Sequence, residues 1–166
     1  MSFPGELLDL ARLTLFEAEQ KRLRIATAES CTGGLIAGLL TEIPGSSSVF
    51  ERGFVTYSNR AKEECLGVPG DMIADCGAVS EPVARAMAEG ALERSHAHVA
   101  VAVTGVAGPG GGTALKPLGL VHIACARTNH AILHERCEFG PLSRDEIRLR
   151  TVEAALTLVR RAVAPV

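Results

Sequence analysis

The chain has 166 residues, 47% of them hydrophobic, and a formal net charge of −2. This length predicts one domain, residues 1–166, with enough core to fold without disulfides, and the mixed charges leave no basic stripe for a nucleic-acid partner. No apolar run approaches the ~20 residues of a membrane span, and the first ten residues lack the basic start and apolar run of a signal peptide, so we expect no membrane partner.

The first part of the chain predicts a helix and then two strand–helix pairs. Apolar residues recur with helical period near the amino terminus, and Gly33-Gly34 marks the start of a later helix that Pro44-Gly45 ends. Ser58 or Asn59 can cap the helix after the second strand. The expected elements are a helix over 5–22, a strand over 24–28, a helix to about 41, a strand over 50–58 and a helix over 59–66 that ends at Gly67.

The second part predicts a long helix, three more strands and a closing helix. Ser80 caps an alanine-rich helix, and residues 98–104 are almost wholly apolar, as in a central strand. The expected later elements are strands over 118–127 and 131–139 joined by a hairpin at 128–130, and a helix from the capping box at 143–146 to about 162. Together these elements predict an α/β fold, a three-layer α/β/α sandwich around a mixed, mostly parallel sheet.

Polar segments follow three of the predicted strands, at residues 29–34, 57–62 and 104–116. In open α/β sheets the functional crevice forms where loops leave the carboxyl ends of the strands. We therefore expect these segments to converge on one pocket.

The segment 104–116 is rich in glycine and ends at Lys116. An open backbone lets amide groups approach a phosphate, and Lys116 would supply a cation. The glycine spacing fits neither a P-loop nor a dinucleotide fingerprint. An anion cradle and a flexible loop are both compatible with this segment.

Lys62 is a candidate general base. A lysine acts as a base only if its neutral form is accessible, which requires burial or a positive potential nearby. Lys62 lies in the first turn of the predicted helix over 59–66, where the helix dipole disfavours an ammonium. Tyr57, the only tyrosine, ends the preceding strand. The alternative is an ordinary surface lysine beside a core tyrosine.

Two kinds of nucleophile are available. Residues 46–48 are serines that follow Pro44-Gly45, where a plain polar loop is the alternative. Cys31 is the rival, although none of the five histidines lies near it in sequence to activate the thiol. The five cysteines form no Cys-x-x-Cys pair and no zinc-like spacing, so we expect no metal, a reducing compartment and a cytoplasmic location.

Glu29, Ser30 and Arg144 each have two possible functions, one at a binding site and one purely structural. Glu29 and Ser30 could orient a substrate amide or cap the helix at Gly33. Arg144 lies in the first turn of the last helix, where a cation indicates either a bound anion or a solvated surface charge.

Several ordered blocks of this sequence resemble the CinA C-terminal family over residues 5–160. They are Thr27-Ala-Glu-Ser-Cys-Thr-Gly-Gly34, Gly45-Ser-Ser47, Gly53-Phe-Val-Thr-Tyr-Ser-Asn59 with Lys62, Gly77-Ala-Val-Ser-Glu81, Thr104-Gly-Val-Ala-Gly-Pro109 and Lys116-Pro-Leu-Gly119. The resemblance implies an α/β/α fold and a nicotinamide-nucleotide amidase, which hydrolyses nicotinamide mononucleotide to nicotinate mononucleotide and ammonia. It implies a serine-lysine mechanism without metal or cofactor.

Carried over residue by residue, the resemblance implies Ser47 as the nucleophile, Lys62 as its base and Tyr57 as a proton relay. Substrate contacts are expected from Ser30, Thr104 and Arg144, with backbone amides from Gly33, Gly34 and Gly108. The approach to Arg144 is longer than the family's usual Gly-x-Arg. The family and the apolar content also predict a homo-oligomer.

Other functions stay open at this point. One is a non-catalytic module that binds a nucleotide or a partner, which the glycine-rich loop and the family's association with competence and DNA damage favour. A metal-dependent hydrolase is disfavoured, because the sequence has no His/Asp/Glu cluster at ligand spacing.

Overall fold

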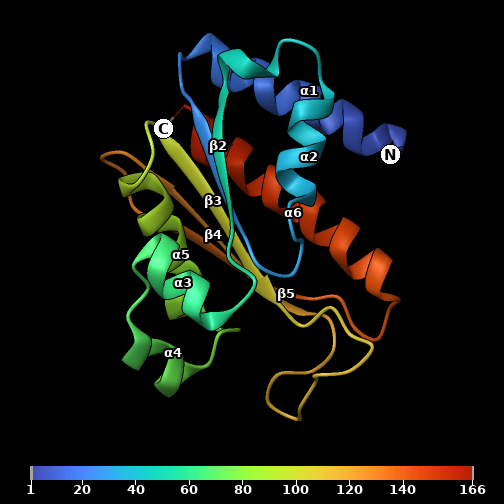
Figure 1. Cartoon of the computed structure of the whole chain (residues 1–166). Coiled ribbons are helices and arrows are strands. Elements are labelled where there is room, and N and C mark those ends of the chain that lie inside the picture. The colour runs from blue at the N-terminus through green and yellow to red at the C-terminus, as the bar shows by residue number, and fades with distance from the viewer. Residues whose placement is uncertain (1, 166) are drawn as a thin grey trace.

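The computed structural model describes residues 2–165, in which a five-stranded sheet lies between two layers of helices (Figure 1). The strand order is β2-β1-β3-β4-β5. The strands are β1 (Ile25–Glu29), β2 (Phe50–Val55), β3 (Val99–Gly105), β4 (Leu120–Arg127) and β5 (Leu133–Glu138).

The sheet is mixed, as predicted. β1 is parallel to both of its neighbours, β2 and β3, whereas β4 is antiparallel to β3 and to β5. Four strands therefore point one way, and β4 runs against them: the loop over 106–119 reverses the chain after β3, and the hairpin at 128–130 reverses it again before β5. The predicted α/β/α sandwich with a mixed sheet is confirmed.

The helices divide between the two faces of the sheet (Figure 1). One face carries α1 (Gly5–Gln20), α2 (Leu35–Glu42) and α6 (Arg144–Val163), and the other carries α3 (Asn59–Leu66), α4 (Gly70–Cys76) and α5 (Glu81–Glu93). Alternation along the strands sorts the core. For example, Val101 of β3 packs under α6, whereas Ala100 and Ala102 face α5.

Serine caps begin three of the helices, as the sequence predicts. The side chains of Ser58, Ser80 and Ser143 accept hydrogen bonds from backbone amides in the first turns of α3, α5 and α6. Gly67, with a φ of 67°, ends α3. The short helix α4 was not predicted, because seven residues are too few to display a helical period.

The parallel strands bring distant segments to one edge of the sheet. β1, β2 and β3 all end at this edge, so the segments that follow them lie side by side there (Figure 1). The short 3-10 helix η1 (Ser46–Ser48) precedes β2 and therefore lies at the opposite edge. Among residues 2–165, no helix has the length and apolar character that crossing a membrane requires.

Candidate active site

A cavity of about 290 Å³ opens at the edge where β1, β2 and β3 end. All three segments that were expected to converge contribute to it, together with the turn before α5 and the first residue of α6. Its lining residues are Ser30, Cys31, Tyr57, Asn59, Lys62, Ala78, Val79, residues 104–108, Gly110, Gly111 and Arg144. The predicted pocket is therefore present.

Lys62 is buried at the base of this cavity, with only 1% of its surface exposed. Its Nζ lies 3.0 Å from Ser30 Oγ, 2.9 Å from the carbonyl oxygen of Thr56 and 3.4 Å from that of Tyr57. No carboxylate pairs with this amine among the described residues. Burial lowers the pKa of Lys62 below its ordinary value.

The three oxygens around Lys62 Nζ can accept all three N–H groups of an ammonium, and they also suit the neutral amine that a general base requires. A neutral primary amine has two N–H groups and one lone pair. The carbonyl oxygens of Thr56 and Tyr57 can accept the two N–H groups, which leaves the lone pair for the hydroxyl of Ser30. In its neutral form Lys62 is thus a proton acceptor next to the Ser30 hydroxyl, and its burial excludes the alternative of an ordinary surface lysine.

Ser30 takes the place that the sequence analysis gave to Ser47. Ser47 is exposed in η1, and the six residues of β2 separate that helix from α3, which carries Lys62. At ~3.3 Å per residue, the strand alone spans ~20 Å. The expected contact between Ser47 and Lys62 is therefore not made, and the hydroxyl that lies next to Lys62 Nζ is that of Ser30.

Glu29 holds the turn that carries Ser30. It is fully buried, and its carboxylate accepts hydrogen bonds from the Thr32 hydroxyl at 2.6 Å and from three amides near the start of α2. These amides belong to Gly34, Ile36 and Ala37. Of the two readings, Glu29 therefore caps the helix, and it does not line the cavity.

Gly33 and Gly34 also shape this turn without lining the cavity. Their φ angles are 56° and 106°, a left-handed conformation that favours glycine. The expected amide contacts of these two glycines with substrate find no support in the cavity lining, and the Gly34 amide donates to Glu29 instead.

Cys31 lines the cavity but has a thiol that resists ionisation. Burial raises the pKa of this thiol to about 12. A thiol becomes a strong nucleophile only as a thiolate. Cys31 is therefore poorly suited to be the nucleophile.

Arg144 and Tyr57 meet at the rim of the cavity. Arg144 donates to Tyr57 Oη at 3.1 Å and to the carbonyl oxygen of Gly108 at 2.7 Å. Thr104 donates to the carbonyl oxygen of Ala78 at 2.9 Å, which closes one wall. All four of the residues predicted here, Arg144, Tyr57, Thr104 and Gly108, line the cavity.

Lys116 does not reach the cavity. Its amine donates to the carbonyl oxygen of Cys76, so the expectation that it would supply the cation of an anion cradle is not met. Gly108, Gly110 and Gly111 of the same loop do line the cavity.

Sequence reasoning missed two features of the site. The turn at Ala78 and Val79 forms a wall, which the Ser80 cap could have indicated, because it places the start of α5 after that turn. Arg148 lies one helical turn after Arg144 and donates to the carbonyl oxygens of Cys31 and Thr32, both at 3.1 Å. The spacing of the two arginines is the available signal.

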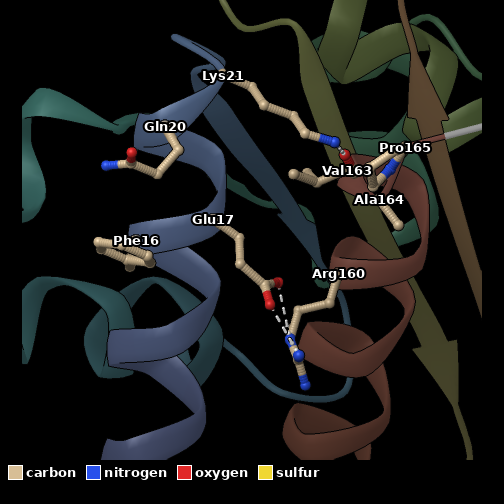
Figure 2. Close-up of a pocket in the computed structure, with 8 residues that line it drawn as sticks. All are labelled: Phe16, Glu17, Gln20, Lys21, Arg160, Val163, Ala164 and Pro165. Carbon is tan, nitrogen blue, oxygen red and sulfur yellow. Dashed lines mark hydrogen bonds and ion pairs between the residues drawn. The ribbon is translucent and has the colours of Figure 1, made fainter.

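A second cavity, of about 280 Å³, lies at the far edge between the ends of α1 and α6 (Figure 2). Glu17 and Arg160 pair across it through two hydrogen bonds, and Lys21 donates to the carbonyl oxygen of Val163. Its residues hold the two helices together and include no nucleophile next to a buried base. Across residues 2–165, no three His, Cys, Asp or Glu side chains are placed to share a metal ion.

Comparison with known proteins gives a consistent result. The sequence profile of the CinA C-terminal domain matches residues 8–163. A CinA-like protein of Akkermansia muciniphila is 61% identical over 117 residues, which cover 70% of this chain and 28% of that protein. A putative competence-damage inducible protein of Symbiobacterium thermophilum is 50% identical over 155 residues, 86% of this chain and 35% of that protein. The chain spans about a third of the length of such relatives.

Solved structures agree over nearly the whole chain. The competence/damage inducible protein CihA of Agrobacterium tumefaciens has a TM-score of 0.95 at 54% identity, and the alignment covers 98% of this chain and 99% of that one. A CinA superfamily protein of Escherichia coli has a TM-score of 0.89 at 30% identity, with 98% and 94% covered. The chain therefore belongs to the CinA C-terminal domain family.

Proposed function

We propose that this protein hydrolyses the carboxamide of nicotinamide mononucleotide to nicotinate mononucleotide and ammonia, with Ser30 as the nucleophile and Lys62 as its base. The observation that carries the proposal is the 3.0 Å separation between Lys62 Nζ and Ser30 Oγ in a cavity where the amine has no carboxylate partner among the described residues. The resemblance to the CinA C-terminal family supplies the substrate.

The first half of the reaction forms an ester. Ser30 Oγ attacks the carboxamide carbon while its proton passes to Lys62 Nζ. The tetrahedral intermediate then collapses, the C–N bond breaks, and the leaving nitrogen takes the proton from Lys62 to depart as ammonia. The nicotinoyl group stays on Ser30, and Lys62 is neutral again.

The second half releases the acid. A water molecule attacks the ester carbon and gives its proton to Lys62, and the Ser30 ester bond breaks as that proton returns to Oγ. The product is the carboxylic acid, which ionises at neutral pH. One amine therefore serves as base and acid in both halves.

Backbone amides next to Ser30 suit the developing oxyanion. The N–H of the residue after a serine nucleophile is a common donor to this oxygen. Here that residue is Cys31, whose amide has no backbone acceptor among residues 2–165. We assign it this role.

Arg144 and Tyr57 are placed to hold the remote part of the substrate. The guanidinium lies at the rim, next to the phenol and the glycine loop, where it can pair with the phosphate of a mononucleotide. Anchoring the phosphate there would orient the carboxamide toward Ser30 and raise its effective concentration.

The test is an ammonia-release assay on purified protein with nicotinamide mononucleotide. We expect turnover by the wild type, with and without a chelator, and a loss of at least ~1000-fold in Ser30→Ala and Lys62→Met. Ser47→Ala, a change of an exposed serine in η1, is the matched control and should keep activity near the wild type.

Two outcomes would contradict the proposal. Activity that survives Ser30→Ala but not Ser47→Ala would restore the assignment made from the sequence. Tight binding of the mononucleotide without release of ammonia would instead indicate the non-catalytic binding module.

A further inference from the structure

Arg148, like Arg144, is an arginine of α6 that donates to groups around the cavity rather than to a carboxylate. Within the described residues, Arg150, Arg160 and Arg161 of the same helix pair with glutamates, at 3.1, 2.8 and 3.6 Å. Arg148 instead gives Nε to the carbonyl oxygen of Cys31 and Nη2 to that of Thr32. A guanidinium is thus committed to two consecutive backbone carbonyls.

Those two carbonyls belong to the turn that carries Ser30. Glu29 holds the amides of the turn from the α2 side, and Arg148 holds its carbonyls from the α6 side. The amide of Ser30 is tied to the carbonyl oxygen of Val103 in β3. Cys31 is buried, and within residues 2–165 its carbonyl oxygen accepts a hydrogen bond from Arg148 and none from a backbone amide.

The same helix also holds the opposite rim. Arg144, one turn before Arg148, contacts Tyr57 Oη and the carbonyl oxygen of Gly108. α6 therefore fixes the nucleophile turn and the substrate rim relative to each other. A small movement of the turn would lengthen the contact between Ser30 Oγ and Lys62 Nζ, and a misplacement of ~1 Å can cost ~100-fold in rate.

We infer that Arg148 is a positioning residue, whose forked guanidinium fixes the Cys31–Thr32 carbonyls and thereby keeps Ser30 Oγ on Lys62 Nζ. This inference rests on the proposed serine-lysine chemistry. It assigns a function in the reaction to a side chain that does not line the cavity.

The fork and the charge of Arg148 can be separated by mutation. Arg148→Lys keeps the positive charge but cannot span two carbonyls, and Arg148→Met removes both. Arg150→Met is the matched control, because Arg150 is exposed on the same helix and pairs with Glu146. We expect kcat to fall ~10- to 100-fold in both Arg148 variants, with KM within ~3-fold of the wild type and no change in the control.

A second readout reports on Ser30 without the nucleotide. The rate at which a fluorophosphonate modifies Ser30 should fall in parallel with kcat. Its pH profile should move to higher pH in both Arg148 variants, because a loosened turn admits water to Lys62 and its pKa rises toward the ordinary value. A purely structural role would leave this profile unmoved in the folded variants.

The outcomes are distinct. Arg148→Lys with the kcat, modification rate and pH profile of the wild type overturns the inference, and so does loss of activity that only follows loss of fold in both variants. If the wild type modifies at Ser30 but releases no ammonia, the proposed function fails and the modification rates still decide the role of Arg148. If Ser30 of the wild type is not modified, both proposals fall.

Discussion

At the scale of single residues, the site depends on one buried amine. Lys62 is held by Ser30 Oγ and two carbonyl oxygens, and burial lowers its pKa. The sequence made Lys62 a candidate base from its place in a helix and Ser30 a substrate contact or cap, but the contact between the two needed the pairing of β1 with β2. Ser30 lies far from Lys62 in sequence, and only the parallel register brings the end of β1 beside the end of β2.

The lowered pKa of Lys62 predicts a pH dependence of stability. The unfolded chain holds the Lys62 proton up to its ordinary pKa of 10.5, whereas the native state releases it at lower pH. Between these two values the unfolded state binds more protons, so the free energy of unfolding should rise with pH. We expect the wild type to gain stability relative to Lys62→Met as pH rises from the lowered pKa toward 10.5.

Urea denaturation of both proteins at several pH values measures this difference. Arg60→Met, an exposed change in the same helix, is the control and should show no such slope. A difference between wild type and Lys62→Met that is constant with pH would show that Lys62 keeps an ordinary pKa.

At the scale of elements, the turn that carries Ser30 is hydrogen-bonded to two helices of the same layer. Glu29 joins it to α2 and Arg148 joins it to α6. The helices and strands themselves could largely be predicted, because caps such as Ser58 and Ser80 and the alternation of strand residues are local signals. The spacing of Arg148 after Arg144 is one signal for it, but its partners could not be predicted, because they depend on how α6 packs against a turn more than a hundred residues earlier.

Glu29→Gln should weaken the attachment to α2. In the wild type both carboxylate oxygens accept hydrogen bonds from backbone amides. In the variant one of these oxygens is replaced by an NH₂ group, which cannot accept, so buried amides are left unpaired. We expect a loss of about 1–3 kcal/mol in the free energy of unfolding, measured by urea denaturation. Glu42→Gln, exposed at the other end of α2, is the control and should change little. Equal stabilities of the two variants would refute a capping role.

At the scale of the whole molecule, the two edges of the sheet carry different structures. The carboxyl edge holds the cavity with Ser30 and Lys62, and the far edge holds the contact between α1 and α6, where Glu17 and Arg160 pair (Figure 2). The three-layer arrangement followed from the alternation of elements in sequence. The sequence did not show at which edge each serine lies, because both segments border a strand: η1 precedes β2, and the turn with Ser30 follows β1.

Arg160→Ala tests this separation. The side chains of Arg160 and Glu17 are 35% and 32% exposed, so their pair should contribute no more than about 1 kcal/mol to the free energy of unfolding. The kcat of the Arg160→Ala variant should equal that of the wild type. The hydrogen bond from Arg160 lowers the pKa of Glu17 below 4.5. The contribution is therefore present above that value and lost as pH falls through the lowered pKa of Glu17. Arg12→Ala, which breaks a more exposed pair, is the control, and a fall in kcat for Arg160→Ala would contradict the separation.

The reversed direction of β4 has a practical consequence. Because β4 runs against its neighbours, its hairpin to β5 turns at the edge away from the cavity, with Asn129 and His130 exposed. An affinity tag inserted at this hairpin would let the protein be immobilised on a solid support with the cavity at Ser30 and Lys62 facing the medium. Chain ends created there by circular permutation would likewise lie away from the entrance to this cavity.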